Sequence, residues 1–352
     1  MSRRTAAGLL ALGLIAVLAA LAVSKPVTYV SFRPGPTLDV LGKFDGETIV
    51  EVRGRKTYRD DGALRMVTVY PSGPDQKVSL FNVVYGWANP DISLFPKDAV
   101  YKDDETSESV REESAGEMTS SQDNATAAAL GALDIDYRTE VEVAEVADDG
   151  PSAGTLEKGD VLVAVDGTPV TSPDSLIALV RGVDPGTPLD LTVRRNGTQR
   201  DVTVTTEAAP DDPKASRIGV GIGADFVFPF SVDITLPERI GGPSAGMMFA
   251  LAIYDVLTPG SLTGGRQIAG SGEITPEGKV GAIGGISQKL PSAQSDGAKL
   301  FLVAEENCAV AVRSHYDPDK MRLVKVSTLD DAIEAVEAWS KDPDVPLPRC
   351  SR

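Results

Sequence analysis

The chain begins with a long uncharged segment, and its length predicts a membrane element. Residues from Thr5 to Val23 carry no charge and are mostly Ala, Leu, Val and Ile. As a helix, these 19 residues would extend about 28 Å, close to the ~30 Å hydrocarbon core of a bilayer. Arg3 and Arg4 precede them, which favours an inside N-terminus. We expect a transmembrane anchor over 1–24, with a signal peptide cleaved after Ala20-Leu21-Ala22 as the alternative.

The segment that follows alternates between β-branched and polar residues. This pattern predicts strands at Thr48–Val52, Leu64–Tyr70 and Lys77–Val84. An acidic run, Asp103–Glu117, is typical of a solvated helix face or loop, and the alanine-rich Asn124–Leu130 after it favours a helix. We therefore expect a β-rich first part that ends before the helix.

From about residue 130 to residue 206 the pattern changes to short strands separated by turns. Asp166-Gly167 and Asn196-Gly197 are hairpin signals. Ser172–Val180 predicts a short helix with proline near its start. The proline-containing segment 207–213 then ends this block and predicts a linker.

Beyond the linker, strands and helices alternate. Pro243–Leu257 is nearly all apolar, which predicts a buried helix. Leu300–Val303 and Leu323–Val326 are expected strands, and Thr328 with Asp331 resembles a capping box that opens a last helix. The chain therefore combines α/β and α+β parts.

Charge and histidine content exclude several classes of function. The formal net charge is −17, which repels phosphate backbones and argues against nucleic-acid binding. The single histidine, His315, lies among turn-forming residues, so we expect a surface position. One histidine excludes a multi-histidine zinc site, and we expect neither a metal nor a cofactor. A nucleophile in this chain would need a base other than histidine.

Cys308 and Cys350 are the two cysteines of the sequence. If the body of the chain lies outside the cytoplasm, a disulfide between them would tie the C-terminal tail to the last domain. Two unrelated thiols are the alternative.

Gly-Pro-Ser-Ala-Gly occurs twice, and only one copy suits a nucleophile. Ser152 is followed by a turn and a strand, so we interpret it as structural. Ser244 is followed directly by the apolar helix, and free amides at a helix N-terminus stabilise negative charge. The backbone around Ser244, at Gly242, Pro243 and Ala245, is the expected site for the substrate carbonyl and its oxyanion.

A lysine can act as the base when burial lowers its pKa. Lys289 follows a glycine-rich, apolar stretch at the expected start of a helix. Spacing alone does not distinguish it from Lys279.

The middle block resembles a bacterial PDZ domain of the type found in envelope proteases. The motifs that carry the resemblance are Gly150-Pro151-Ser152-Ala153-Gly154, Leu156-Glu157-Lys158-Gly159-Asp160 and Val165-Asp166-Gly167. PDZ domains hold a peptide C-terminus at a sheet edge. The resemblance implies a carboxylate-binding loop at Leu130, Gly131 and Ala132, which departs from the usual Gly-Leu-Gly-Phe.

Residues 217–340 resemble the proteolytic domain of Lon proteases. The motifs occur in order: Gly242–Gly246, Ser271-Gly272-Glu273-Ile274-Thr275, and Ile283-Gly284-Gly285 leading to Lys289. The resemblance implies Ser244 as nucleophile, Lys289 as general base and Ser271 as the hydroxyl that orients the amine. Gly241 departs from the aspartate that is common in Lon, which changes how the nucleophile loop is held.

The resemblance to membrane-anchored Lon-like proteases of Gram-positive bacteria implies a PDZ module inserted in the protease domain, and family members often form hexamers. The expected parts are an anchor at 1–24, the start of the protease domain at 25–123, the PDZ domain at 124–210, the Lon-type domain at 211–341 and a tail at 342–352. No nucleotide-binding Walker motif occurs in the sequence.

These parts predict an ATP-independent serine endopeptidase, tethered to the cell membrane, that cleaves proteins or peptides outside the cytoplasm. A tethered PDZ scaffold without catalysis is the main alternative. A Ser-Lys signal peptidase ranks lower, since such enzymes carry their site near the anchor.

Overall fold

A computed structural model describes residues 3–24, 26–59, 61–237 and 239–351. The chain folds as two compact units, and the second is inserted into the first. The first unit comprises 1–135 and 230–352, and the second comprises 136–229. The expected boundaries at 124 and 210 differ from these, because the helix before the insertion belongs to the first unit and a strand after residue 210 completes the second.

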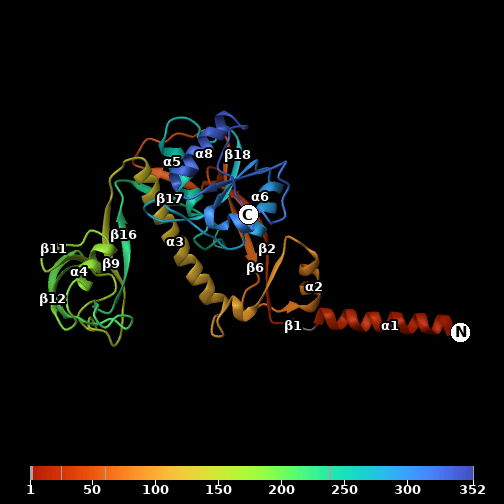
Figure 1. Cartoon of the computed structure of the whole chain (residues 1–352), viewed down its shortest axis with the longest axis horizontal. Helices are drawn as coiled ribbons and strands as arrows, with labels where there is room; N and C mark the ends of the chain where they lie inside the picture. Colours follow the sequence, from red (N-terminus) through yellow and green to blue (C-terminus); the bar gives the residue numbers. More distant parts are fainter. Residues whose placement is uncertain (1–2, 25, 60, 238, 352) are drawn as a thin grey trace. The chain divides into compact units, whose positions relative to one another are not determined.

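The first unit is built on a six-stranded sheet in the order β22-β21-β18-β6-β2-β8 (Figure 1). The strands are β2 (Tyr29–Asp39), β6 (Ala63–Pro71), β8 (Ser93–Pro96), β18 (Gln267–Ser271), β21 (Leu300–Ala304) and β22 (Arg322–Val326). β6, β18, β21 and β22 run parallel, whereas β2 pairs antiparallel with both β6 and β8. The carboxyl ends of the parallel strands therefore meet at one edge, where Ser271 ends β18.

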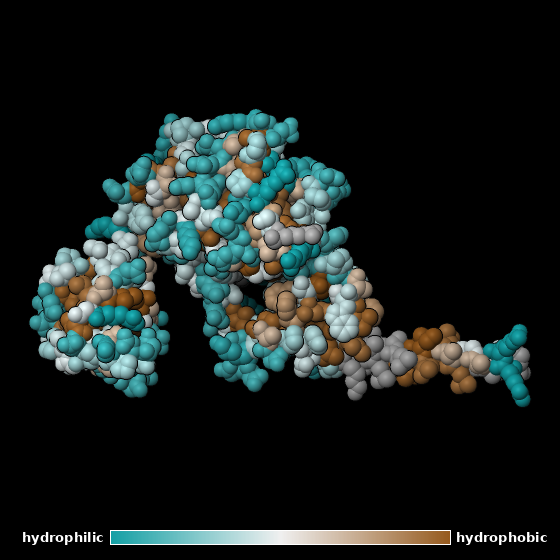
Figure 2. Space-filling model, viewed as in Figure 1, coloured by the Kyte–Doolittle hydropathy of each residue, from teal (hydrophilic) through white to brown (hydrophobic). Residues whose placement is uncertain are grey.

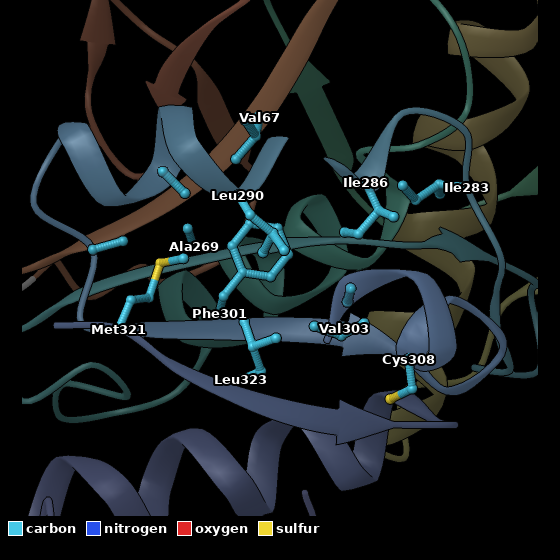
Figure 3. Packing of buried hydrophobic residues seen from close by; sticks show 13 residues of the cluster. Val67, Ala269, Ile283, Ile286, Leu290, Phe301, Val303, Cys308, Met321 and Leu323 are labelled. Carbon is cyan, nitrogen blue, oxygen red and sulfur yellow. The ribbon is translucent and has the colours of Figure 1, made fainter. Parts of the chain in front are cut away.

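Two helices contact this sheet. The alternation of side chains along its strands shows that they lie on opposite faces. Ala269 and Phe301 lie in one apolar cluster with Ile286 and Leu290 of α6 (Ile286–Ser295), as Figure 3 shows. The next residue along β18 is Gly270, where an added Cβ would lie 2.6 Å from Met248 Sδ of α5 (Gly246–Leu257). Successive strand residues point to opposite faces, so α6 and α5 cover opposite faces of the sheet.

The first unit contains further helices and short strand pairs besides this sheet and its two helices. The helices are α1 (Arg3–Ser24), α2 (Leu80–Ala88), α3 (Ser107–Ala132), α7 (Cys308–Ala311) and α8 (Leu329–Lys341). The short antiparallel pairs are β1 (Pro26–Val27) with β7 (Val78–Ser79), β3 (Lys43–Phe44) with β4 (Glu47–Thr48), β5 (Val50–Arg53) with β17 (Ser231–Ile234), and β19 (Glu273–Ile274) with β20 (Val280–Gly281). The predicted capping box of Thr328 and Asp331 opens α8 and is confirmed.

Of two further local predictions, one differs from the structure and one, the solvated helix face or loop of the acidic run, is confirmed. The strand expected over Lys77–Val84 is β7 followed by the helix α2, because the Ser79 hydroxyl accepts a hydrogen bond from Asn82 N and caps a helix there. The sequence of α2 resembles that of a strand because the helix is apolar on its exposed face as well as on its buried face. The acidic run forms the first half of α3, with its charged side chains exposed.

The predicted anchor coincides with α1, which has 22 residues. Within the described ranges, no helix combines the length and the hydropathy that crossing a membrane requires. The transmembrane helix of the predicted fold is therefore not supported by the structure.

The second unit is a small sheet with its own apolar core. The strand order is β13-β12-β10-β9-β16, and β11 pairs with β10. The strands are β9 (Arg138–Val146), β10 (Val161–Val165), β11 (Thr168–Pro169), β12 (Pro188–Arg195), β13 (Thr198–Thr205) and β16 (Val220–Val227), with the short pair β14 (Glu207–Ala208) and β15 (Ser216–Arg217) beside them. The helix α4 (Pro173–Arg181) supplies Leu176 and Val180 to the core. Its predicted start at the Ser172 cap is confirmed.

The C-terminal tail is fixed to the first unit along β22, the edge strand of the large sheet. Cys350 forms a disulfide with Cys308, across 42 residues of sequence. The Lys325 amide donates to the Pro348 carbonyl, and the Arg322 guanidinium donates to the Val345 carbonyl. The tail therefore occupies the outer side of β22.

Candidate active site and peptide groove

Ser244, Lys289 and Ser271 meet at the carboxyl end of β18. Lys289 Nζ lies 2.7 Å from Ser244 Oγ and 2.8 Å from Ser271 Oγ. The Ser271 hydroxyl donates to the Ser244 carbonyl at 2.9 Å. The three residues come from the loop before α5, the end of β18 and the first turn of α6, so the fold brings together the three side chains that the sequence selected.

The position of Lys289 depends on how α6 starts. Gly285 caps the helix at φ +73°, a conformation that residues with a Cβ adopt at a cost. The helix then turns Leu290 into the apolar cluster and leaves Lys289 1% exposed. A buried lysine needs polar partners, and the two serine hydroxyls provide them.

Burial changes the protonation of this amine. Desolvation lowers the pKa of Lys289 from 10.5 to about 7, although the nearby carboxylate of Glu273 acts to raise it. Desolvation also raises the pKa of Glu273, and the charge of Glu117 adds to that rise. A large share of Lys289 is therefore neutral near pH 7 and free to accept the Ser244 proton.

The nucleophile loop is held by α3. The Gly242 amide donates to the Ser114 carbonyl at 2.9 Å, and the Ser121 hydroxyl donates to the Pro243 carbonyl at 3.0 Å. A Cβ on Gly241 would lie 2.9 Å from Ser114 Cβ, so α3 occupies the space that an aspartate would need there. The close approach of α3 therefore explains why residue 241 is a glycine.

Of the backbone positions expected around the oxyanion, Ser244 and its neighbour Ala245 keep amides that are free among the residues that the structure describes, whereas Gly242 and Pro243 do not. The Gly242 amide is already bonded and Pro243 has no N–H, so neither donates to a substrate. In the described part of the chain, the amides of Ser244 and Ala245 have no acceptor. The helix α5 begins at Gly246, two residues later than Ser244, so these two amides belong to the turn that leads into it.

A cavity of about 270 Å³ opens beside this loop. Glu117, Asn124, Pro243, Glu273 and Ile274 are among its lining residues. It provides room for a substrate chain next to Ser244, with two carboxylates on its wall.

The second unit has a larger cavity, of about 430 Å³, between α4 and the segment 216–222. Leu176, Ile177 and Val180 form its apolar wall, and Arg217 lines it. Among the described residues, the amides of Ile218 and Gly219 donate to no acceptor. Within the same described ranges, Arg217 Nε is buried without a partner, while Nη2 of the same guanidinium forms an ion pair with Glu207. Adjacent free amides beside a guanidinium are typical of a carboxylate site.

Comparison with known families identifies two domains in the chain. Residues 116–206 match the PDZ domain family, and residues 204–337 match the Lon protease (S16) C-terminal proteolytic domain. The chain therefore carries a PDZ domain and a Lon-type proteolytic domain.

Individual relatives match each part separately. The Lon protease of Rhizobium meliloti (strain 1021) is 32% identical over 158 residues, which are 44% of this chain and 19% of that protein. A probable periplasmic serine endoprotease DegP-like protein of Halomonas elongata is 43% identical over 80 residues, 22% of this chain and 17% of that protein. The chain thus spans about a fifth of the length of these relatives.

Among solved structures, the PDZ domain of an SdrC-like protein from Listeria monocytogenes is similar at 22% identity and a TM-score of 0.22. The match covers 23% of this chain and 85% of that domain.

The remaining predicted residues are not part of the cluster of Ser244, Lys289 and Ser271. Ser152 is fully buried in the PDZ domain, where its hydroxyl donates to the Ile218 carbonyl. His315 is mostly exposed and contacts Asp91 at 2.8 Å. Lys279 is also exposed. In the described part of the chain, no group of metal-ligating side chains is found.

The predicted carboxylate loop requires a correction. Leu130, Gly131 and Ala132 form the last turn of α3 in the first unit, and Leu130 is fully buried there. In the described residues of the PDZ domain, free amides lie instead at Ile218 and Gly219, next to Arg217 and just before β16. The sequence signal for this segment is the run Arg217-Ile218-Gly219-Val220-Gly221-Ile222, which follows the PDZ core.

Proposed function

We propose that this protein is a serine endopeptidase that uses the Ser244–Lys289 dyad and works without ATP. The observation that carries the proposal is the 2.7 Å contact between a serine hydroxyl and a lysine amine that is 1% exposed and whose pKa is about 7. The matched Lon-type domain and the absence of a Walker motif in the sequence support it. Without an unfoldase, suitable substrates are unfolded proteins and flexible peptides.

The geometry supports an acyl-transfer mechanism. The neutral amine of Lys289 takes the proton of Ser244 as Oγ bonds to the substrate carbonyl carbon. The amides of Ser244 and Ala245 donate to the oxygen that gains negative charge. As the C–N bond breaks, Lys289 returns the proton to the leaving amine. A water molecule then attacks the acyl group on Ser244, with Lys289 again accepting the proton and returning it to Ser244 Oγ, and the acyl group is released. Ser271 accepts a hydrogen bond from the amine throughout and keeps it pointed at Ser244.

Active-site labelling tests this assignment. The full chain is treated with a fluorophosphonate, and the adduct is located by mass spectrometry. We expect the adduct on Ser244, with casein cleavage in the absence of ATP lost in parallel and both lost in Ser244→Ala. Labelling of Ser152, or equal cleavage by Ser244→Ala, contradicts the proposal. A chain that binds peptides without cleaving casein would be the PDZ scaffold.

The pH dependence should depend on Glu273. Its carboxylate raises the pKa of Lys289, so Glu273→Gln should lower that pKa further. Because the neutral amine is the active form, kcat/KM should rise with pH around 7 in the wild type, and the midpoint should move to lower pH in the variant. Initial rates on a peptide substrate measure both profiles. Glu277→Gln, at an exposed glutamate four residues away, should leave the midpoint unchanged; an equal shift there contradicts the argument.

We further propose that the PDZ groove binds the C-terminus of a peptide with an apolar last residue. The free amides of Ile218 and Gly219 and the guanidinium of Arg217 support carboxylate binding, and the apolar wall supports the last side chain. This binding either recruits substrates or regulates cleavage.

Substitution at Ile177 tests the groove. Ile177 lines the cavity and is 43% exposed, so Ile177→Asp should fold normally and weaken peptide binding about tenfold or more. Fluorescence anisotropy with a labelled peptide measures the affinity. Ala178→Asp, on the same helix but outside the cavity, should bind as the wild type does. A peptide with a C-terminal amide should bind poorly, and equal binding would contradict the carboxylate site.

We also propose, as the sequence predicts, that α1 attaches the protein to the cell membrane with its catalytic domain outside the cytoplasm. The exposed apolar side chains of α1, such as Leu10 and Ile15, support attachment. The Cys308–Cys350 disulfide supports an oxidising compartment. Assembly into hexamers, implied by the Lon resemblance, is measurable by analytical ultracentrifugation.

A further inference from the structure

The helix α2 exposes an apolar face that neither the catalytic dyad nor the PDZ groove uses. Its sequence, Leu-Phe-Asn-Val-Val-Tyr-Gly-Trp-Ala, carries no charge. The side chains of Phe81, Val84, Tyr85 and Trp87 are each more than half exposed, and Trp87 is the most exposed at 69%. Exposed apolar patches of this kind mark contacts with a membrane or another protein.

The exposed residues form one continuous face. At ~100° per residue, the exposed side chains from Leu80 to Trp87 fall within roughly 160° of the helix circumference. Val83 and Gly86 lie on the opposite side and are buried. A Cβ on Gly86 would lie 2.9 Å from Leu94 Cδ1, so close packing against this part of the chain fixes which side of the helix faces outward. Rotating the helix to hide its aromatic rings would open this packing.

The start of α2 is tied to the end of α1 by backbone pairing. α1 ends at Ser24, and Pro26 in β1 lies opposite Ser79 in β7. Ser79 is also the residue that caps α2. Paired strands lie about 5 Å apart, so the two helix ends are neighbours. The helices also contact each other, and Figure 2 shows apolar side chains gathered over both.

The composition of the face fits the boundary between lipid and water. Tyr and Trp combine an apolar ring with a polar N–H or O–H group and are enriched at the headgroup level of membranes. The nine residues include neither Lys nor Arg, and the chain has a net charge of −17. Attraction to anionic lipids therefore cannot supply the binding energy, and partition of the aromatic rings can.

A second copy of the chain is a weaker fit as the occupant. A stable dimer buries about 800 Å² on each partner, whereas the exposed face of a single nine-residue helix offers a few hundred Å² at most. A bilayer needs no complementary shape and is already adjacent if α1 is attached to it.

We propose that α2 lies in the headgroup region of the lipid bilayer to which α1 attaches the chain. This inference rests on the proposed membrane attachment and adds a second, rigid contact to it. One attached helix leaves the Lon-type domain free to rotate about its connection. A second contact on the same unit restricts that rotation, so that the catalytic site is held in a defined orientation over the membrane.

Tryptophan fluorescence tests the position of α2. The chain has two tryptophans, and Trp339 is 5% exposed, so Trp339→Phe leaves Trp87 as the only reporter. The full-length variant is reconstituted in phosphatidylcholine vesicles that carry a spin label either near the headgroup or near the end of the acyl chain. We expect Trp87 emission to shift to shorter wavelength and to be quenched roughly twofold more by the label near the headgroup. The same signal is obtained as the difference between wild type and Trp87→Phe, should Trp339→Phe fail to fold.

Three results would overturn the proposal. If the protein stays with the vesicles but iodide quenches Trp87 as it does a free indole, α2 faces water and the attachment by α1 stands alone. If the protein does not stay with the vesicles, both ideas fail. If Trp87 is shielded from iodide only in samples that sediment as a dimer, a second copy covers α2.

A matched pair of variants tests whether the quenching depends on the apolar side chains of α2. Phe81→Ser with Tyr85→Ser should lower the quenching by the headgroup label, while Val310→Ser, at a 49% exposed apolar residue of α7, should not. Equal quenching in all three proteins would also contradict a bilayer contact at α2.

Discussion

Replacement of Lys289 by methionine is expected to abolish peptidase activity while making the folded protein more stable. Loss of the base should lower kcat/KM by roughly 10⁴-fold or more at every pH. Methionine fills a similar volume without carrying a charge, so it removes the cost of desolvating the ammonium group. Peptide cleavage and denaturant unfolding, measured on the same preparations, test both effects.

The gain in stability should itself depend on pH. The amine has a pKa of about 7 in the folded chain and 10.5 when unperturbed, so between these values the unfolded chain binds the extra proton. The free energy of unfolding of the wild type should therefore rise with pH over this window, by up to about 1.4 kcal/mol per pH unit relative to Lys289→Met. The stabilisation by methionine is then largest below pH 7 and disappears above 10.5.

Lys279→Met is the matched control, since Lys279 is exposed and lies ten residues earlier in the same segment. It should change neither activity nor the pH dependence of stability. Residual activity above a tenth of the wild type in Lys289→Met would mean that another group takes the Ser244 proton.

Removal of the disulfide is expected to have the second large effect. Cys308 and Cys350 close a loop across 42 residues, and a loop of this length stabilises the folded state by about 4 kcal/mol in the chain-entropy description. The double variant Cys308→Ala, Cys350→Ala should lose about 2 to 4 kcal/mol. Unfolding can be followed by the buried Trp339 in a Trp87→Phe background, so that the signal reports the Lon-type domain.

The reductant dependence provides the control. A thiol reductant should shift the wild-type unfolding midpoint to that of the double variant and should leave the variant itself unchanged. Equal midpoints for the wild type and the double variant in the absence of reductant would mean that the disulfide contributes nothing to the stability of the domain.

The two residues of the proposed dyad were predictable because each lies in a short segment that can be recognised from the sequence. A helix-opening Gly-Pro-Ser-Ala-Gly and a glycine-rich entry to Lys289 can be identified from short segments, and the parallel sheet then brings them together. The family resemblance, and not the spacing, selects Lys289 over Lys279 as the proposed base. The structure adds the reason, since Lys289 is buried while Lys279 is exposed.

The features that sequence reasoning missed depend on contacts between distant segments. The proposed carboxylate site of the PDZ domain follows its core in sequence, so the strand β16 beside the groove comes from residues beyond the family match. The helix α2 was predicted as a strand because its apolar residues lack helical periodicity. That periodicity is absent because the face that points outward is apolar, as is the face that packs on the protein.

The tail that lies along β22 has a consequence for association between chains. An edge strand with unpaired amides and carbonyls is a template for adding a strand from another molecule. Here the backbone of the tail accepts from Lys325 and Arg322, and the bond at Cys350 keeps it in place. Reduction would release the tail and expose the edge of the sheet to pairing with another chain. In a thiol-rich compartment, the risk for this protein is therefore aggregation through β22 as well as loss of stability.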